Sequence, residues 1–248
     1  MRKRTLITFA ATLLVSVALH AQTVDEILDK NAAAKGGWEK LRALKSVRMS
    51  GKMQMGGMEA PFVMVKSRPE QVRMEFTVQG MTGIQSYDGS TGWMVMPFMG
   101  KKDPEQMSGD MLKDLKEQAD FDGPMVDYAK KGNKVELLGK EEIEGTPAYK
   151  LKLTTKAGDE TIVFVDAESF LEIKMQAKRK IQGQEIEAET SLGNYQEFGG
   201  MLFPTSIEMK PKGAPAGQTI TIDKIELNPT LAGEYFAMPK AAKAEVKQ

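Results

Sequence analysis

Strand-length segments follow one another, with no helical segment between them, from residue 134 nearly to the end of the chain. Glycines punctuate the boundaries between these segments. Consecutive strands joined by short turns pair antiparallel, because a parallel pair needs a long crossover connection. This half of the chain is therefore restricted to an antiparallel sheet. The expected strands are 134–144, 147–156, 160–166, 170–181, 184–196, 201–210 and 218–227.

A similar pattern begins earlier, at Ser46. From Ser46 to Met55 the residues alternate strictly, so that Val47, Met49 and Met53 point to one side and polar residues point to the other. Such alternation is typical of a half-buried strand. The further strands expected before the middle of the chain are 60–66, 71–79, 81–87 and 93–96.

Helices are expected at the start of the domain and in its middle. Thr23 and Glu26 form a capping-box pattern for a first helix, and a short second helix is expected after Gly36-Gly37. In the middle, Asp103 suits an N-cap and Pro104 suits the first helical position. Another short helix is expected at 126–131. The apolar stripe of the middle helix consists of Met107, Met111, Leu112, Leu115 and Ala119.

The first 21 residues have the three parts of a secretory signal peptide. Basic residues at 2–4 precede an apolar stretch, 6–19, that is too short to span a bilayer comfortably. We expect cleavage after Ala21, so that the mature, exported chain begins at Gln22. An N-terminal membrane anchor is the alternative interpretation of this segment.

The mature chain has neither cysteine nor histidine, because the single histidine, His20, lies in the signal peptide. The usual metal ligands, the thiol nucleophile and the commonest general base are missing, so we expect no metal, no cofactor and no catalytic residue. Removing three of 34 basic residues leaves 31 against 34 acidic residues, a charge of −3, which argues against a nucleic-acid partner. Residues 22–239 suit one β-rich domain, and we expect 240–248 to be a disordered tail.

Three glutamates lie at alternate positions of one predicted strand: Glu185, Glu187 and Glu189. They could form a calcium site or an acid/base pair, and an enzyme that uses carboxylates alone is a rival interpretation. If the chain turns at Gln182-Gly183, however, Lys180 faces Glu185 and Lys178 faces Glu187 across the hairpin. Cross-strand ion pairs on a solvated face explain these residues without chemistry, and we expect no enzyme activity.

Methionine is concentrated in one stretch, since 13 of the 18 methionines lie between Met49 and Met125. Methionine is flexible and polarizable, and it suits surfaces that accept partners of varied shape. It specifies a rigid core poorly. An apolar sheet face lined in this way, beside a methionine-bearing helix, could form an adaptable cavity. Ordinary core packing is the alternative explanation.

Several short strings form a series along the chain. The first is Lys66-Ser67-Arg68-Pro69 with the strand 71–76 after it. Asp88-Gly89-Ser90-Thr91-Gly92-Trp93 follows, with Pro97-Phe98 behind it, and Glu234-Tyr235-Phe236 with Pro239 lies near the end. In order and spacing, these strings resemble the basic turn, the Asp-Gly turn with its tryptophan strand, and the C-terminal aromatic element of the LolA-type periplasmic lipoprotein carriers. The resemblance covers most of the mature chain, including the hairpin 161–190.

The resemblance implies a mainly β (α+β) fold, namely a single incomplete antiparallel β-barrel, or half-barrel, with helices covering its open apolar side. It implies a periplasmic carrier that binds the acyl chains of lipoproteins, or lipids, and shuttles them toward the outer membrane. Its partners would be an inner-membrane donor and an outer-membrane acceptor, and we expect a monomer. In this family an arginine in the basic turn hydrogen-bonds to the lid helices. Arg68 is therefore the expected lid latch, and a solvated arginine before a proline is the alternative.

We predict that apolar side chains of the early strands and of the covering helix line the cavity. The chain is longer than this family's pattern, so a regulatory module that senses lipid or lipoprotein remains an alternative to a carrier. A structural envelope protein with a filled core is a further alternative. The predicted lining residues are Phe62, Met64, Val72, Met74, Phe76, Trp93, Met94 and Met96 on the strands, with Met107, Met111 and Leu115 on the helix.

Overall fold

The computed structural model describes residues 22–181 and 184–239. The expected signal peptide, the turn at Gln182-Gly183 and the expected tail lie outside the described residues. The described chain folds mostly as strands, and these form a single 13-stranded sheet. The strands are β1 (Ser46–Met55), β2 (Met58–Ser67), β3 (Gln71–Val78), β4 (Met81–Tyr87), β5 (Gly92–Met96), β6 (Lys101–Gln106), β7 (Lys134–Ile143), β8 (Thr146–Thr154), β9 (Glu160–Asp166), β10 (Glu172–Ile181), β11 (Gln184–Phe198), β12 (Met201–Pro211) and β13 (Gln218–Leu227).

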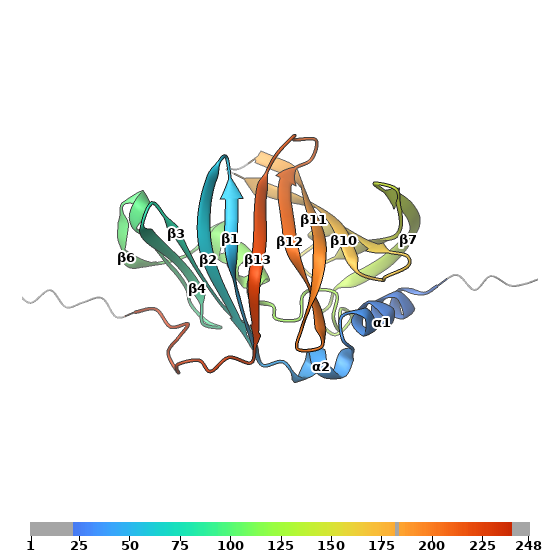
Figure 1. Cartoon of the computed structure of the whole chain (residues 1–248), viewed down its shortest axis with the longest axis horizontal. Coiled ribbons are helices and arrows are strands. Elements are labelled where there is room, and N and C mark those ends of the chain that lie inside the picture. Colours follow the sequence, from blue (N-terminus) through green and yellow to red (C-terminus); the bar gives the residue numbers. More distant parts are fainter. Residues whose placement is uncertain (1–21, 182–183, 240–248) are drawn as a thin grey trace, which may run out of the picture.

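The sheet is antiparallel throughout, with the order β6-β5-β4-β3-β2-β1-β13-β12-β11-β10-β9-β8-β7. Strands consecutive in sequence therefore pair with each other, except β6 and β7, which form the two edges, and β1 pairs with β13 to join the two halves of the chain at the centre. Figure 1 shows an open, curved sheet with β6 and β7 at its opposite ends. This open antiparallel sheet is consistent with the expected half-barrel, and the strand predictions agree with it to within a few residues.

One face of this sheet, here called the inner face, carries the helices and most of the apolar side chains. Helix α1 (Val24–Ala34) buries Ile27 and Leu28 against β7, β8 and β9. Helix α3 (Gly109–Ala119) buries Leu115 and Ala119 against strands β3 and β5. Leu44, which follows α2 (Trp38–Ala43), packs near the centre of the sheet with residues of β1, β2, β12 and β13. The helices thus lie over parts of one face of the sheet.

The first helix begins as predicted. The Thr23 side chain accepts a hydrogen bond from the backbone of Glu26, and the Glu26 carboxylate accepts one from the backbone of Thr23. This capping box satisfies two backbone donors that the helix itself cannot satisfy. Gly36 and Gly37, both with positive φ, then turn the chain into α2.

The prediction of a helix that begins at Asp103 is wrong. Residues Lys101–Gln106 form strand β6 at the edge of the sheet, where Glu105 pairs with Met94 and Lys101 with Met96. Proline lacks a backbone donor, and an edge strand tolerates it as readily as a first helical turn does. Helix α3 starts later, at Gly109. The predicted helix at 126–131 is also wrong, because the chain makes turns there.

The opposite face, here called the outer face, is covered near β4 and β5 by the segment that follows β13. Trp93 is fully buried there, and its indole nitrogen donates to the carbonyl of Phe236 at 2.9 Å. The Ser86 hydroxyl donates to the same carbonyl at 2.9 Å. Arg73 donates to the carbonyl of Tyr235 at 3.2 Å. These contacts attach the C-terminal segment to the outer face.

Close packing between the two central strands requires glycine at position 51. A Cβ atom built on Gly51 would lie 1.9 Å from the carbonyl oxygen of Thr221 on β13. We expect Gly51→Ala to lower the free energy of unfolding by about 1–3 kcal/mol, because backbone has to move to relieve the overlap. Urea denaturation measures this loss. Gly193→Ala in β11 is the matched control, since nothing lies within 4 Å of its added carbon, and it should be neutral or slightly stabilising. Equal effects at the two sites would contradict the proposed overlap.

Candidate functional site

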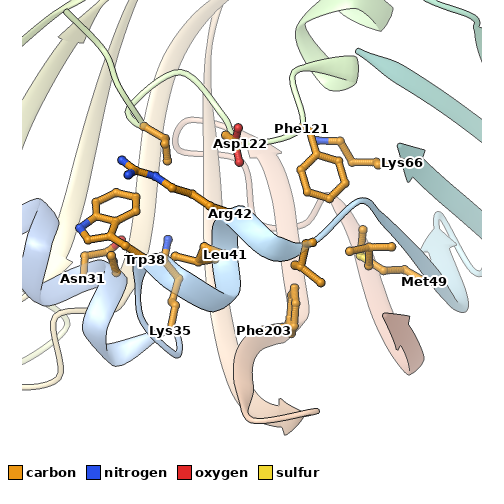
Figure 2. Close-up of a pocket in the computed structure, with 14 residues that line it drawn as sticks. Asn31, Lys35, Trp38, Leu41, Arg42, Met49, Lys66, Phe121, Asp122 and Phe203 are labelled. Carbon is orange, nitrogen blue, oxygen red and sulfur yellow. The ribbon is translucent and has the colours of Figure 1, made fainter. Parts of the chain in front are cut away.

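A cavity of about 200 Å³ lies on the inner face, between the helical N-terminal segment, the loop 120–127 and the central strands. Figure 2 shows its lining, with Trp38, Asn31 and Lys35 at one end and Phe121, Lys66 and Met49 at the other. Apolar side chains predominate, and they are interrupted by three cations (Lys35, Arg42 and Lys66), one carboxylate (Asp122) and one amide (Asn31). The lining residues are Asn31, Ala32, Lys35, Trp38, Leu41, Arg42, Leu44, Val47, Met49, Lys66, Phe121, Asp122, Val126 and Phe203.

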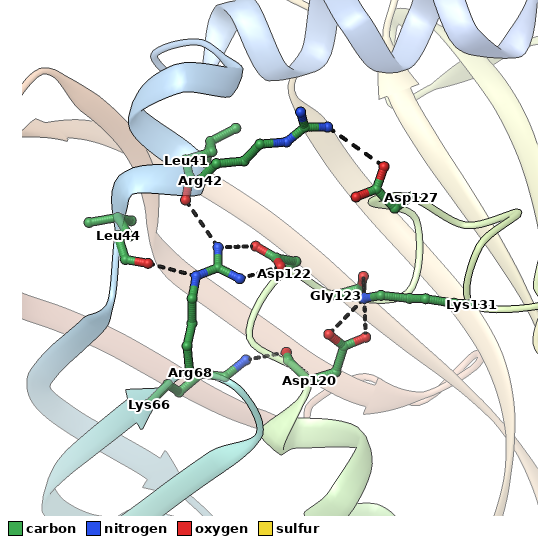
Figure 3. Close-up of polar contacts among 10 residues, drawn as sticks. All are labelled: Leu41, Arg42, Leu44, Lys66, Arg68, Asp120, Asp122, Gly123, Asp127 and Lys131. Carbon is green, nitrogen blue, oxygen red and sulfur yellow. Dashed lines mark hydrogen bonds and ion pairs between the residues drawn. The ribbon is translucent and has the colours of Figure 1, made fainter.

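Arg68 joins three segments beside this cavity (Figure 3). Its Nε donates to the carbonyl of Leu44 at 2.7 Å and its Nη2 to the carbonyl of Leu41 at 3.2 Å, which caps the end of α2. Both Nη atoms also donate to the Asp122 carboxylate at 2.5 Å. The guanidinium lies 4.5 Å from the centroid of the Phe121 ring. Hydrogen bonding to Asp122 raises the pKa of Arg68 above its ordinary value, so its charge is permanent.

Two lysines hold the start of the loop 120–127. The Lys66 ammonium donates to the backbone carbonyl of Asp120 at 2.8 Å. Lys131 reaches both carboxylate oxygens of Asp120 at 2.7 Å and the carbonyl of Gly123 at 2.8 Å. Burial lowers the pKa of Lys66, although the Asp120 and Asp122 charges oppose this shift. The loop is therefore fixed at the cavity by polar contacts at several points, as Figure 3 shows.

The predicted cavity residues lie beside the cavity rather than around it. Val72, Met94, Met96 and Met107 are buried together with Leu115 of α3, and Met64 and Phe76 pack against them. Phe62 belongs to the neighbouring central cluster. Met74 pairs with Met64 on the inner face, and Met111 on α3 is 48% exposed. None of the predicted residues is among those that line the cavity of about 200 Å³.

Trp93 does not belong with the other predicted lining residues. Adjacent residues of a strand point to opposite faces, so Trp93 cannot share a face with Met94. The register pairs Trp93 with Ser86, and both side chains bind the C-terminal segment on the outer face. The prediction that Trp93 lines the cavity is therefore wrong.

The inner face also carries a partly exposed row of methionines, here called the methionine surface. The strand registers place these residues on the same face as the cavity, and Met49, which lines the cavity, pairs with Met64. Met81 and Met209 are 38% and 36% exposed, and the other members are half-buried. The surface therefore continues outward from the cavity. It consists of Met53, Met64, Met74, Met81 and Met209.

Two of the three glutamates singled out in β11, Glu187 and Glu189, have ion-pair partners. The backbone register places Lys178 opposite Glu187 and Lys180 opposite Glu185, which confirms the predicted hairpin register. The Glu187 carboxylate lies 3.0 Å from Lys212 Nζ, and that of Glu189 lies 3.2 Å from Lys174 Nζ. Within the described part of the chain, no group of three or more acidic, histidine or cysteine side chains could hold a metal ion.

Comparison with solved structures defines the fold class, although no protein-family model and no curated protein matches the sequence. The chain has the LolA-type fold. A LolA superfamily protein from Nitrosomonas europaea is 17% identical, with a TM-score of 0.57, and the match covers 87% of this chain and 98% of that one. A domain described as an outer membrane lipoprotein-sorting protein from Vibrio parahaemolyticus is 12% identical, with a TM-score of 0.57, and the match covers 86% of this chain and 95% of that one. A DUF1329 family protein from Desulfovibrio piger ATCC 29098 is 14% identical, with a TM-score of 0.60, and the match covers 86% of this chain and 96% of that one.

Proposed function

We propose that this protein carries lipids, or the acyl chains of lipoproteins, on the inner face of its sheet. The observation that supports this most is the methionine surface, which is apolar, partly exposed and continuous with a cavity. Apolar side chains left in water add no stability, and an exposed apolar surface beside a cavity is the usual form of a site for an apolar ligand. Methionine adapts its shape to chains of different length and branching.

The likeness to a LolA superfamily protein and to a lipoprotein-sorting domain supports the same class of cargo. In this proposal the signal peptide directs the chain to the periplasm, where it receives cargo from an inner-membrane donor and passes it to an outer-membrane acceptor. It acts as a monomer and catalyses no reaction.

The size of the cavity bears on how cargo would bind. Pockets that enclose a drug-sized ligand measure roughly 300–1,000 Å³, so a cavity of about 200 Å³ holds only part of a lipid. The remaining chain would lie on the methionine surface, or α3 and the loop 120–127 would move aside. Each buried CH₂ contributes about 0.8 kcal/mol, so even a partly bound acyl chain is retained without specific polar contacts.

Release is the harder step for a carrier of this kind. A cavity that costs free energy to open binds its cargo less tightly, because the binding-competent state is only a fraction of the population. Arg68 and Asp122 would supply that cost, since they hold the loop 120–127 against α2 in the closed state. Cargo could then pass to an acceptor with a more apolar site.

A lipid census tests the proposed function. The mature protein is purified from the periplasm without detergent, extracted with organic solvent and analysed by mass spectrometry, both as extract and as intact protein. We expect acyl chains, or a co-purifying lipoprotein, in stoichiometric amount. A protein that carries nothing and also takes up no apolar dye would contradict the proposal and favour a filled core. Stable capture of a membrane protein in a pull-down, without transfer of cargo, would favour a sensor.

A further inference from the structure

Lys66 places a positive charge in the wall of the cavity, and within the described part of the chain it has no ion-pair partner. Its ammonium donates one hydrogen bond, to the carbonyl of Asp120 at 2.8 Å. An ion pair requires a carboxylate oxygen within 4.0 Å of the ammonium nitrogen. Among the described residues, no carboxylate oxygen lies that close to Lys66 Nζ. The Lys66 side chain is half-buried, and even a partly buried charge is normally paired, because taking an ion out of water is costly. Lys66 is therefore an exception that calls for an explanation.

The carboxylates around the cavity are already engaged by other cations. Asp122 is held by Arg68, and Asp120 by Lys131. The two other cations of the cavity wall have partners of their own: Lys35 lies 2.7 Å from Glu172, and Arg42 lies 3.6 Å from Asp127. The charge of Lys66 is thus left over once these pairs are formed.

The contact with Asp120 accounts for Lys66 only in part. Asp120 is the C-cap of α3, and a cation near a helix C-terminus is weakly favourable. An ammonium has three donors, however, and this contact uses one of them. The two remaining donors belong to a side chain that lines the cavity.

The strand geometry places apolar side chains next to this charge. Inward-facing residues of β2 recur every second position, so Lys66 is followed on the inner face by Met64 and then by Phe62. Met49, on the neighbouring strand, lines the cavity and pairs with Met64. A ligand with an anionic end at Lys66 would therefore have its apolar part along this row.

We propose that Lys66 binds the carboxylate of a long-chain fatty acid, whose hydrocarbon chain lies along Met49 and Met64. One unpaired ammonium matches the single charge of a carboxylate. A carboxylate also ends its chain, whereas a phosphodiester carries substituents on both sides and needs more space than a cavity of about 200 Å³ provides. This inference rests on the proposed function and names one class of cargo for it.

The test compares oleate with methyl oleate, which has the same chain without the charge, on the mature full-length protein. The measured quantity is the ratio of the two affinities, so that differences in solubility between the ligands cancel between variants. We expect Lys66→Gln to lower the acid-to-ester preference roughly tenfold or more, as for the loss of a hydrogen bond to a charged group. Glutamine keeps a donor for the Asp120 carbonyl, and Lys66→Met supplies a second variant without charge.

Two control variants separate charge from structure. Lys66→Arg keeps the charge and should keep most of the preference. Lys40→Gln removes a positive charge from α2, where the side chain contacts the carbonyl of Gly200, and should leave the ratio unchanged. A purely structural role for Lys66 would weaken both ligands alike. An unchanged ratio in Lys66→Gln and Lys66→Met overturns the inference but leaves the proposed function standing. If the parent protein binds neither oleate nor methyl oleate, the inference and the proposed function are both overturned.

Discussion

Trp93→Ala should lower the free energy of unfolding by about 3–5 kcal/mol, the range typical of truncating a large buried aromatic side chain. Trp93 is 0% exposed and is among the largest fully buried side chains of the described residues. The substitution leaves a void between β5 and the C-terminal segment. It also removes the donor that binds the Phe236 carbonyl. Urea denaturation followed by circular dichroism measures the loss.

The face on which Trp93 lies decides what else should change. Because its side chain packs on the outer face, the folded variant should bind apolar ligands with unchanged stoichiometry. A tryptophan that lined the cavity would behave oppositely, with reduced ligand binding at nearly normal stability. If the substitution lowered the free energy of unfolding by less than about 1 kcal/mol, this result would contradict the burial described for Trp93.

A double-mutant cycle with Phe236→Ala tests the partner segment. Phe236 is buried, and its backbone carbonyl accepts from both Trp93 and Ser86. Residues in direct contact couple, so the two substitutions together should cost clearly less than the sum of their separate effects. Additive losses would mean that the C-terminal segment and β5 are stabilised independently.

The strands could be predicted from the sequence because their signal is local. The alternation from Ser46 to Met55 and the glycine-punctuated segments after residue 134 correspond to β1 and to β7–β13. The capping box at Thr23 and Glu26 is also a local signal, and α1 begins there. The prediction failed for edge strand β6, because Asp103-Pro104 suits a helix start and an edge strand equally well. Only the pairing of this segment with Met94 and Met96 decides between the two.

The cavity could not be predicted in the same way, because no single segment contains it. Its lining comes from α1, α2, β1, β2, β12 and the loop 120–127, which are far apart in sequence. Trp38 and Leu41 were recognisable as apolar positions of a short helix, but nothing local indicated that this helix lies over the central strands. Which face of the sheet Trp93 lies on depends on the strand register. The sequence does not fix that register, because Trp93 and the adjacent Met94 are both apolar and either could face the core.

The Arg68 guanidinium should hold the loop 120–127 closed against α2, so Arg68→Leu should open it. The substitution removes two bonds to Asp122, the bonds to the carbonyls of Leu41 and Leu44, and the contact with Phe121. These contacts share one partly exposed guanidinium and are replaced by water on opening, so they do not add, and we expect a net loss of about 1–3 kcal/mol from the closed state. A shift of 1–3 kcal/mol changes the ratio of open to closed molecules by roughly 5–150-fold.

Two measurements report this opening. Amide hydrogen exchange in residues 120–127 should accelerate by that factor, and uptake of an apolar dye should rise. Transfer of cargo to an acceptor should be impaired, because an open cavity retains cargo without the opening cost that favours hand-off. Arg68→Lys should have an intermediate effect, since lysine keeps the charge but cannot bind Asp122 and both carbonyls at once.

Arg73→Leu is the matched control for loss of a partly buried arginine. Arg73 lies on the outer face, where it contacts Glu75, the carbonyl of Tyr235 and the ring of Trp93. It should lower stability without accelerating exchange in the loop 120–127 and without raising dye uptake. If Arg68→Leu and Arg73→Leu had the same effects on loop exchange, dye uptake and transfer, Arg68 would be a structural residue. Faster loop exchange with normal transfer would confine Arg68 to holding the loop and remove it from the transfer step.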